Sequence, residues 1–213
     1  MLEVHPPHEP THTWKDFFLH VGTICVGLLI AVSLEQTVEY FHHRHQLHYL
    51  EDALEHEIVQ NKQIVQQDID LADKIARIEK ANKASLEAAT RPRSHTSIVF
   101  LPSPAITTDN QAAWRAPLGS VSAAARDSGT ITLLPISRAS YLTRLDITYA
   151  NDVDLQHQLF DQEYRVRAYA QLHNDLTPQQ RQDMLLVVSQ YQQTAEHTRF
   201  VLERTRAILE QAH

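Results

Sequence analysis

The chain has 213 residues and a formal net charge of −7, with 26 acidic residues against 19 lysines and arginines. This acidic balance argues against binding to nucleic acid, and against attachment to anionic lipids through a polybasic patch. Only four glycines are present, and two of them lie in one apolar segment, so no glycine-rich phosphate-binding loop can be built from the rest.

That apolar segment, Phe17–Leu34, follows a short N-terminal tail of residues 1–16 and contains no formal charge. As a helix it would cover about 27 Å, close to the hydrocarbon core of a bilayer at about 30 Å. A cleaved signal peptide would need a basic region before the segment and a small-residue cleavage site after it, and neither is present. The sequence therefore predicts a single-pass transmembrane helix over 17–34 that acts as an uncleaved signal anchor.

Small side chains recur within the anchor at Thr23, Gly27 and Ala31. Residues four apart share a helix face, and small residues there let two membrane helices approach closely. The stripe predicts packing against a second copy or another membrane subunit. One basic residue flanks the anchor on each side, Lys15 before it and Arg44 after it, so charge does not set the orientation. The short tail before the anchor favours an extracytoplasmic, periplasmic C-terminal domain.

Residues 35–90 form one predicted stalk helix that continues from the anchor, with apolar residues near a 3.6-residue period. Its length suggests a break near Asn61 or Asp70. A Pro/Ser/Thr-rich loop over 91–111 follows, and residues 112–213 are predicted to form a helical bundle that packs on the stalk. The expected helices there are Gln111–Ala125, one capped by Ser137 and reaching Tyr149, one over Asn151–Asn174 that is either separate or continuous with it, and one from Thr177–Pro178 to Gln211.

The last of these helices carries an a/d seam with alternating steps of four and three residues. Such a seam fits either an intramolecular bundle or an intermolecular coiled coil, and alanine and threonine at seam positions favour the bundle. The predicted fold class is all-α: an N-terminal transmembrane helix, a long stalk helix and an antiparallel helical bundle. The seam positions are Met184, Val188, Tyr191, Ala195, Thr198, Leu202, Thr205 and Leu209.

Two segments resemble a family of bacterial single-pass membrane proteins that is known only as a domain of unknown function. The first is GLLIA at residues 27–31, followed by LEQ at 34–36 and YLEDAL at 49–54. The second combines Trp114, the DSG run at 127–129, the LLP run at 133–135 and Tyr149. The resemblance implies a membrane-anchored helical domain, and it supplies no catalytic residues.

A histidine cluster follows the anchor, and His42, His45 and His48 share one helix side. Neutral imidazoles at this spacing can bind Zn, Cu or Ni, but ligands from another element would be needed. A polar collar beside the membrane is the favoured interpretation, with a metal site and a pH-responsive role as alternatives.

Other candidate chemistry is sparse. The acid groups Asp68/Asp70/Asp73 and Asp152/Asp154 are predicted to be solvated faces rather than acid–base catalysts, and no G-x-S-x-G elbow is present. The only cysteine, Cys25, lies within the anchor. Trp114 is predicted to be a core residue, with stacking on a ligand as the alternative.

The sequence thus predicts a non-catalytic protein without a cofactor, whose partners are the lipid bilayer and either other membrane subunits or itself as a homo-oligomer. The leading hypothesis is a scaffold or accessory subunit of a membrane assembly. The alternatives are an extracytoplasmic bundle that senses a ligand or pH, and a histidine-based metal-binding membrane protein.

Overall fold

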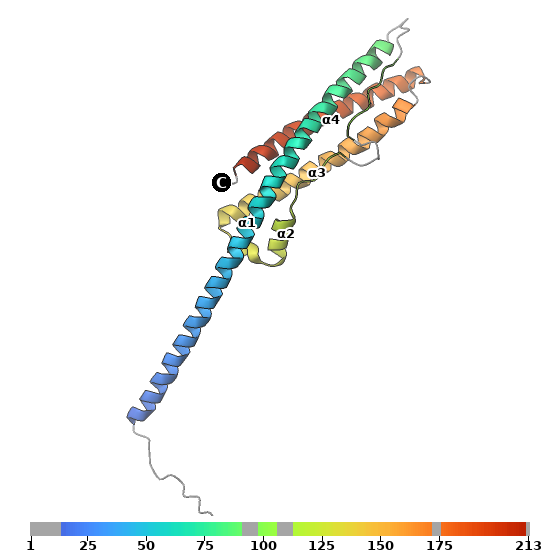
Figure 1. Cartoon of the computed structure of the whole chain (residues 1–213). Coiled ribbons are helices and arrows are strands. Elements are labelled where there is room, and N and C mark those ends of the chain that lie inside the picture. Colours follow the sequence, from blue (N-terminus) through green and yellow to red (C-terminus); the bar gives the residue numbers. More distant parts are fainter. Residues whose placement is uncertain (1–13, 91–97, 106–112, 172–175, 212–213) are drawn as a thin grey trace, which may run out of the picture. The chain divides into compact units, whose positions relative to one another are not determined.

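The structure is a computed structural model that describes residues 14–90, 98–105, 113–171 and 176–211. All regular secondary structure within these ranges is helical, which confirms the all-α prediction (Figure 1). The chain divides into two compact units, residues 1–49 and 50–213. The predicted tail at 1–13, parts of the predicted loop at 91–97 and 106–111, and the predicted helix end at Asn174 lie outside the described residues.

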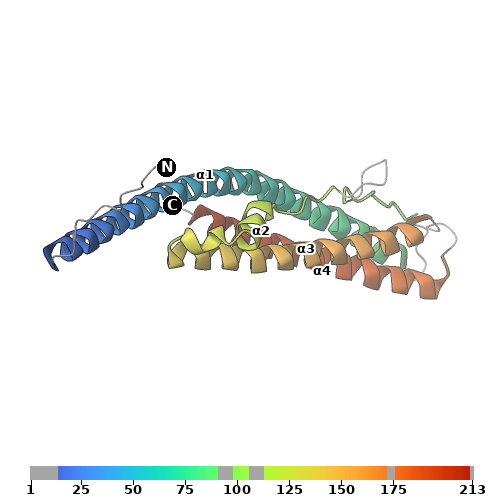
Figure 2. The same cartoon turned by 90° about the horizontal axis from the view of Figure 1, so that it is seen from below.

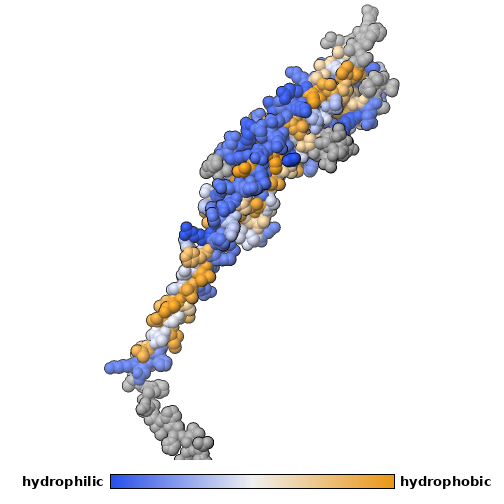
Figure 3. Space-filling model, in the orientation of Figure 1, coloured by the Kyte–Doolittle hydropathy of each residue, from blue (hydrophilic) through white to orange (hydrophobic). Residues whose placement is uncertain are grey.

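The first unit contains the N-terminal part of α1, a helix that runs from Trp14 to Thr90. Within the described residues, α1 is the one helix long and apolar enough to cross a membrane, and its apolar segment is exposed throughout. Figure 3 shows this segment as an apolar, orange surface. The hydroxyl of Thr23 donates to the carbonyl of Leu19 at 2.8 Å, and that of Ser33 to the carbonyl of Leu29 at 2.7 Å. These two side-chain donors are therefore satisfied within the helix.

The second unit is a bundle of three long helices: α1 from Leu50 onward, α3 (Ile136–Gln171) and α4 (Pro178–Glu210). Its core begins where the apolar period of α1 becomes buried and includes fully buried residues from all three helices. The predicted break near Asn61 or Asp70 is absent, because both residues lie inside the continuous helix. The core residues exposed by less than 2% include Leu54, Val65, Ile75, Leu86, Leu159, Val166, Met184, Tyr191, Leu202 and Leu209.

The bundle has an extended segment where a fourth helix would be expected. After α1 the chain returns along the bundle through residues 98–105 and 113–119, which we call the strap, and only then enters α3 (Figures 1 and 2). Successive passes of the chain are therefore antiparallel, while α1 and α3 run in the same direction. Side-chain hydrogen bonds pair Asn61 with Tyr149 and Asp68 with Gln156, which fixes this parallel register.

The strap corrects the prediction of a helix over Gln111–Ala125. Within the described residues, helix α2 covers only Ser120–Asp127, and residues 113–119 are not helical. Pro117 and Gly119 explain the late start, because proline disfavours the helical conformation in the residue before it and glycine lowers helix propensity. A 3₁₀ turn, η1 (Thr130–Leu133), follows Gly129, whose φ of 74° is the left-handed conformation that glycine adopts at low cost.

The boundaries of α3 and α4 show which local sequence signals were sufficient to predict where a helix begins. Helix α4 begins at Thr177–Pro178 as predicted, with Thr177 as its cap and Pro178 in its first turn. Thr177 also forms a capping box with Gln180. Helix α3 is continuous from Ile136 to Gln171, so it joins the two helices expected there. The prediction that Ser137 caps this helix is wrong, because the helix already begins at Ile136.

Candidate ligand-binding site

The core of the bundle contains an unusual number of polar side chains. A buried polar group costs free energy unless it is hydrogen-bonded, so each one calls for a partner. Those from α1 are Glu57, Asn61, Asp68, Glu79 and Asn82; those from α3 are Asp152, Gln156 and Glu163; those from α4 are Thr198 and Thr205.

Two buried asparagines of α1 clamp the strap in the same way. The amide of Asn82 accepts from the backbone N–H of Leu101 at 2.7 Å and donates to its carbonyl at 3.0 Å. The amide of Asn61 makes the same pair of bonds to Leu118, at 2.6 and 2.7 Å, and also donates to the hydroxyl of Tyr149 at 2.9 Å. A segment outside regular secondary structure must find partners for its backbone, and these amides supply them.

Two buried acids of α1 also serve the segment that follows α1. Glu57 Oε2 accepts from the Ser120 hydroxyl and the Val121 backbone N–H, both at 2.9 Å, at the start of α2. Asp68 accepts from the Arg115 backbone N–H at 3.4 Å and from the Gln156 amide at 3.1 Å. Together with the asparagine clamps, these bonds give a structural reason for most of the polar row on α1.

Asp68 and Asp152 contradict the prediction that their acid groups are solvated faces, because both are buried to 1% exposure or less. Asp70 and Asp154, in contrast, are exposed. Asp152 accepts from the hydroxyl of Thr205, at 3.2 and 3.0 Å to its two oxygens. Burial raises the pKa of Asp152 to about 6, and the hydrogen bond from Thr205 opposes that rise.

A second group of buried polar residues is only partly satisfied. Glu163 Oε1 accepts from Arg167 Nε at 2.7 Å, and Glu79 Oε2 accepts from the Asn82 amide at 3.2 Å. The other oxygens, Glu163 Oε2 and Glu79 Oε1, are buried and have no hydrogen-bond partner among the described residues. The two acids are exposed by 1% and 0%. Two buried carboxyl oxygens therefore receive no hydrogen bond from the described parts of the strap and the helices.

Tyr191 and Ser103 complete this group. The Tyr191 hydroxyl lies 3.0 Å from Ser103 Oγ, which also accepts from the backbone N–H of Ala105. Burial raises the pKa of Tyr191. The negative charge of Glu163 and a hydrogen bond from the phenol to its carboxylate raise this pKa further, and the hydrogen bond with Ser103 lowers it. Tyr191 therefore stays a neutral phenol beside Glu163. Either hydroxyl can be the donor in the contact between Tyr191 and Ser103, and the single phenol proton serves either Ser103 or the Glu163 carboxylate at one time.

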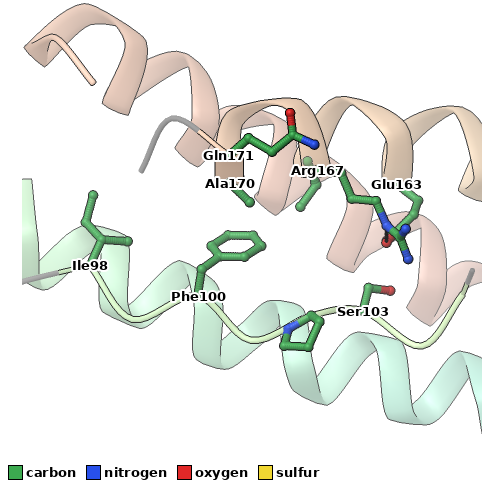
Figure 4. Close-up of a pocket in the computed structure, with 9 residues that line it drawn as sticks. Ile98, Phe100, Ser103, Glu163, Arg167, Ala170 and Gln171 are labelled. Atoms are coloured by element: carbon green, nitrogen blue, oxygen red, sulfur yellow. Dashed lines mark hydrogen bonds and ion pairs between the residues drawn. The ribbon is translucent and has the colours of Figure 1, made fainter. Parts of the chain in front are cut away.

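A cavity of about 390 Å³ opens beside Glu163, between the strap and the C-terminal part of α3 (Figure 4). Glu163, Arg167 and Ser103 make one part of its wall polar. The ring of Phe100 projects toward Ala170 at the other part. The full lining is Ile98, Phe100, Pro102, Ser103, Glu163, Val166, Arg167, Ala170 and Gln171. A volume at the lower end of the range typical of ligand pockets, with few polar groups on an apolar wall, suits a small molecule.

The buried acids of α1 hold protons near neutral pH. Burial raises the pKa of Glu79 to about 8; the Asn82 hydrogen bond opposes the rise and the charge of Glu163 adds to it. Burial raises the pKa of Asp68 to about 7; the bond from the Arg115 backbone opposes this and the charge of Asp152 adds. Protonation of Glu79 removes the repulsion that two neighbouring carboxylates would otherwise feel.

The histidines named as metal candidates lie along one helix, and the described residues bring no ligand from another element to them. His42, His45 and His48 are exposed on α1; His42 contacts Gln46 at 3.0 Å, and His45 stacks edge-on against Tyr49. Across the described ranges, no group of three or more histidine, cysteine, aspartate or glutamate side chains is placed to hold a metal ion.

The remaining predicted residues are placed as follows. Trp114 is 7% exposed, as expected of a core residue, and it does not line the cavity beside Glu163. Every seam residue of α4 is fully buried within the bundle. Thr23, Gly27 and Ala31 are exposed on the apolar part of α1.

Sequence reasoning missed the site itself. One available signal was the replacement of apolar residues by Asn61, Asp68, Glu79 and Asn82 within the buried period of α1. On α3, Asp152, Gln156 and Glu163 follow one another at steps of four and seven, which keeps them on one helix side.

Comparison with known proteins adds no assignment. No protein-family model, no curated protein and no solved structure matches the chain. The resemblance to the bacterial membrane-protein family stays a prediction.

Proposed function

We propose that this protein is a membrane-anchored, non-catalytic helical bundle that senses a small ligand in the cavity beside Glu163. The observation that carries the proposal is the state of Glu163, which lines the cavity. Its Oε2 is buried and has no hydrogen-bond partner among the described residues. An unpaired buried oxygen is costly to the protein alone, and a ligand that donates a hydrogen bond to it removes the cost.

Binding is favoured over catalysis by the arrangement of the two acids. Many acid–base reactions use one group as the acid and a second as the base, and the second buried acid, Glu79, does not line the cavity. Glu163 is thus the one carboxylate that the described residues contribute to the lining, and its Oε1 already accepts from Arg167. One anchored carboxylate on a mostly apolar wall fits recognition of a ligand.

Sensing, rather than storage, is proposed because α1 contains both Glu79 and the apolar segment. A ligand that changes the charge of the Glu163–Glu79 pair acts on the same helix that contains the anchor. We propose the same orientation as the sequence favours, with the bundle on the extracytoplasmic side.

A ligand screen on the full chain in lipid nanodiscs tests the binding step. Ala170→Leu fills the cavity, and Ala168→Leu makes the same change at an exposed position of α3. We expect compounds that raise the melting temperature of the wild type and of Ala168→Leu but not of Ala170→Leu. A screen without any compound of this kind contradicts the proposal.

Cys25 gives a readout for the sensing step, because it is the only cysteine and lies in the apolar segment. A spin label or fluorophore on Cys25 should change its signal when a cavity ligand is added to the wild type, and not in Ala170→Leu. Binding without any change at Cys25 would leave a ligand-binding protein that is not a sensor.

The second candidate function is an accessory subunit that acts through helix packing within the membrane. The apolar part of α1 is exposed on all sides, including the small residues Thr23, Gly27 and Ala31, which favours a partner helix. Crosslinking in native membranes, followed by purification and identification of what is attached, tests this candidate. A protein that stays monomeric and alone under crosslinking contradicts it.

A further inference from the structure

Glu163 is the one acid that lines the cavity among the described residues, and its Oε2 is buried without a hydrogen-bond partner there. The side chain is 1% exposed, its other oxygen accepts from Arg167 at 2.7 Å, and Oε2 has no partner within the described residues. A ligand group that pairs with Oε2 must be a hydrogen-bond donor, because a carboxylate oxygen accepts hydrogen bonds. A cationic donor gains more than a neutral one, because hydrogen bonds between two charged groups are the stronger kind.

The residues that line the cavity disfavour three classes of ligand. An anion would be repelled by the Glu163 carboxylate. A divalent metal ion would need several oxygen ligands, and the described residues place no third acidic or histidine side chain there. A diamine would bring its second charge against Ile98, Phe100 and Val166, where none of the described residues supplies an acid.

The apolar wall and the volume define the rest of the ligand. Phe100 from the strap and Val166 from α3 line this space of about 390 Å³. An aromatic ring such as Phe100 also attracts a cation that lies over its face. The net charge of −7 favours the approach of a cation over long distances.

We propose that the cavity binds a small organic monoamine, with its ammonium group donating to Glu163 Oε2 and its apolar body packed between Phe100 and Val166. This proposal rests on the proposed function and names the chemical class of its ligand. The ammonium gives Glu163 one cationic partner for each oxygen, since Arg167 already holds Oε1.

The test compares three probes of nearly the same shape and different charge on the full chain in nanodiscs. They are 2-phenylethylamine, the neutral 2-phenylethanol and the anionic 3-phenylpropanoate, each titrated by calorimetry at pH 7. We expect the amine to bind with one site per chain, about tenfold or more tighter than the alcohol, and the acid to show no binding. An amine that binds no better than the alcohol overturns the proposal without the need for any variant.

Variants then assign the charge to one residue. Glu163→Gln keeps the shape of the side chain and should lower amine affinity to that of the alcohol. Asp161→Asn removes the same charge from an exposed position of α3 and should leave amine affinity unchanged. Phe100→Ala should weaken amine and alcohol by the same factor. Amine binding that survives Glu163→Gln overturns the proposal.

The outcomes separate this proposal from the broader one. If the alcohol or the acid binds in a Phe100-dependent manner and the amine does not, the ligand class is wrong and the cavity remains a ligand site. If none of the three probes binds and the screen with Ala170→Leu also finds no ligand, both proposals fall.

Discussion

Asn61 and Asn82 show how one side-chain type can replace a strand partner. Each presents an acceptor and a donor to the N–H and carbonyl of a single leucine in the strap, as a neighbouring strand would. The two residues therefore hold an irregular segment against a helix whose own backbone groups are already used. Removal of either amide leaves two backbone groups of the strap without partners.

We predict that Asn61→Ala lowers the free energy of unfolding by about 2 kcal/mol, because it leaves the Leu118 backbone and the Tyr149 hydroxyl unpaired. The midpoint of urea unfolding of the full chain in detergent, followed by circular dichroism, measures the change. Gln63→Ala removes an exposed amide from the same helix and should shift the midpoint little. Equal effects of the two substitutions would contradict the role of the clamp.

The buried acids make a prediction about pH. The pKa values of Asp152, Asp68 and Glu79 are raised to about 6, 7 and 8, above their ordinary values of 3.8, 3.8 and 4.5. The folded state therefore holds protons that the unfolded chain has lost. The stability that these three groups contribute is fully present below about pH 4, and this contribution is lost as the pH rises toward 8.

We expect the unfolding free energy to fall by about 1.4 kcal/mol per pH unit for each proton held only by the folded state. Chemical denaturation at pH 5, 6, 7 and 8 measures the slope. Glu79→Gln removes the group with the highest of the three pKa values and should flatten the slope between pH 7 and 8. A wild-type stability that rises over this range would show that the buried acids are ionised in the folded state.

At the scale of elements, local signals were enough wherever the chain makes its own contacts. The capping box at Thr177 was predictable because donor and acceptor lie three residues apart. The long period of apolar residues in α1 was predictable for the same reason. The strap was not, because its backbone is held by Asn61 and Asn82, far away in sequence, and only the fold brings them together.

The same distance explains the error at Asp68 and Asp152. In the sequence, Asp68 lies between the exposed Gln67 and Asp70, and Asp152 between the exposed Asn151 and Asp154. Their hydrogen-bond partners inside the bundle, Gln156 and Thr205, lie 88 and 53 positions away. The cavity could not be predicted either, since one wall is the strap.

The capping box of α4 gives a prediction at this scale. Thr177→Ala removes the acceptor for the Gln180 backbone N–H at 3.2 Å and should cost about 1 kcal/mol of stability. Thr194→Ala, inside the same helix, loses only a bond to the carbonyl of Gln190 and should be close to neutral. Thermal melting of both variants measures the difference, and a Thr194→Ala effect as large as that of Thr177→Ala would contradict the capping argument.

For the whole molecule, the proposals depend on what covers the apolar segment of α1. The bundle satisfies most of its polar groups internally, whereas the apolar segment of α1 is exposed on every side. If the segment crosses a membrane, as we propose, two environments can cover it: lipid alone, or lipid and a second helix. The small residues Thr23, Gly27 and Ala31 favour the second, and helix geometry makes that choice testable with cysteine substitutions.

Cys25 and Gly27 lie on nearly opposite sides of α1, because two steps of about 100° along a helix leave them about 160° apart. If two copies pack through the stripe, a cysteine at position 27 faces its counterpart in the other copy, while Cys25 faces lipid. Gly27 has open space around it, so a side chain there meets no obstacle among the described residues.

We therefore predict that Gly27→Cys combined with Cys25→Ser forms a disulfide-linked dimer when native membranes are oxidised, and that the wild type, with Cys25 alone, does not. Non-reducing gel electrophoresis measures both. The reverse result, a dimer through Cys25 only, would place the contact on the other side of the helix and exclude the stripe. If neither protein forms a dimer, α1 does not pair with its own copy through either side, and the small residues would then have to serve a different partner helix.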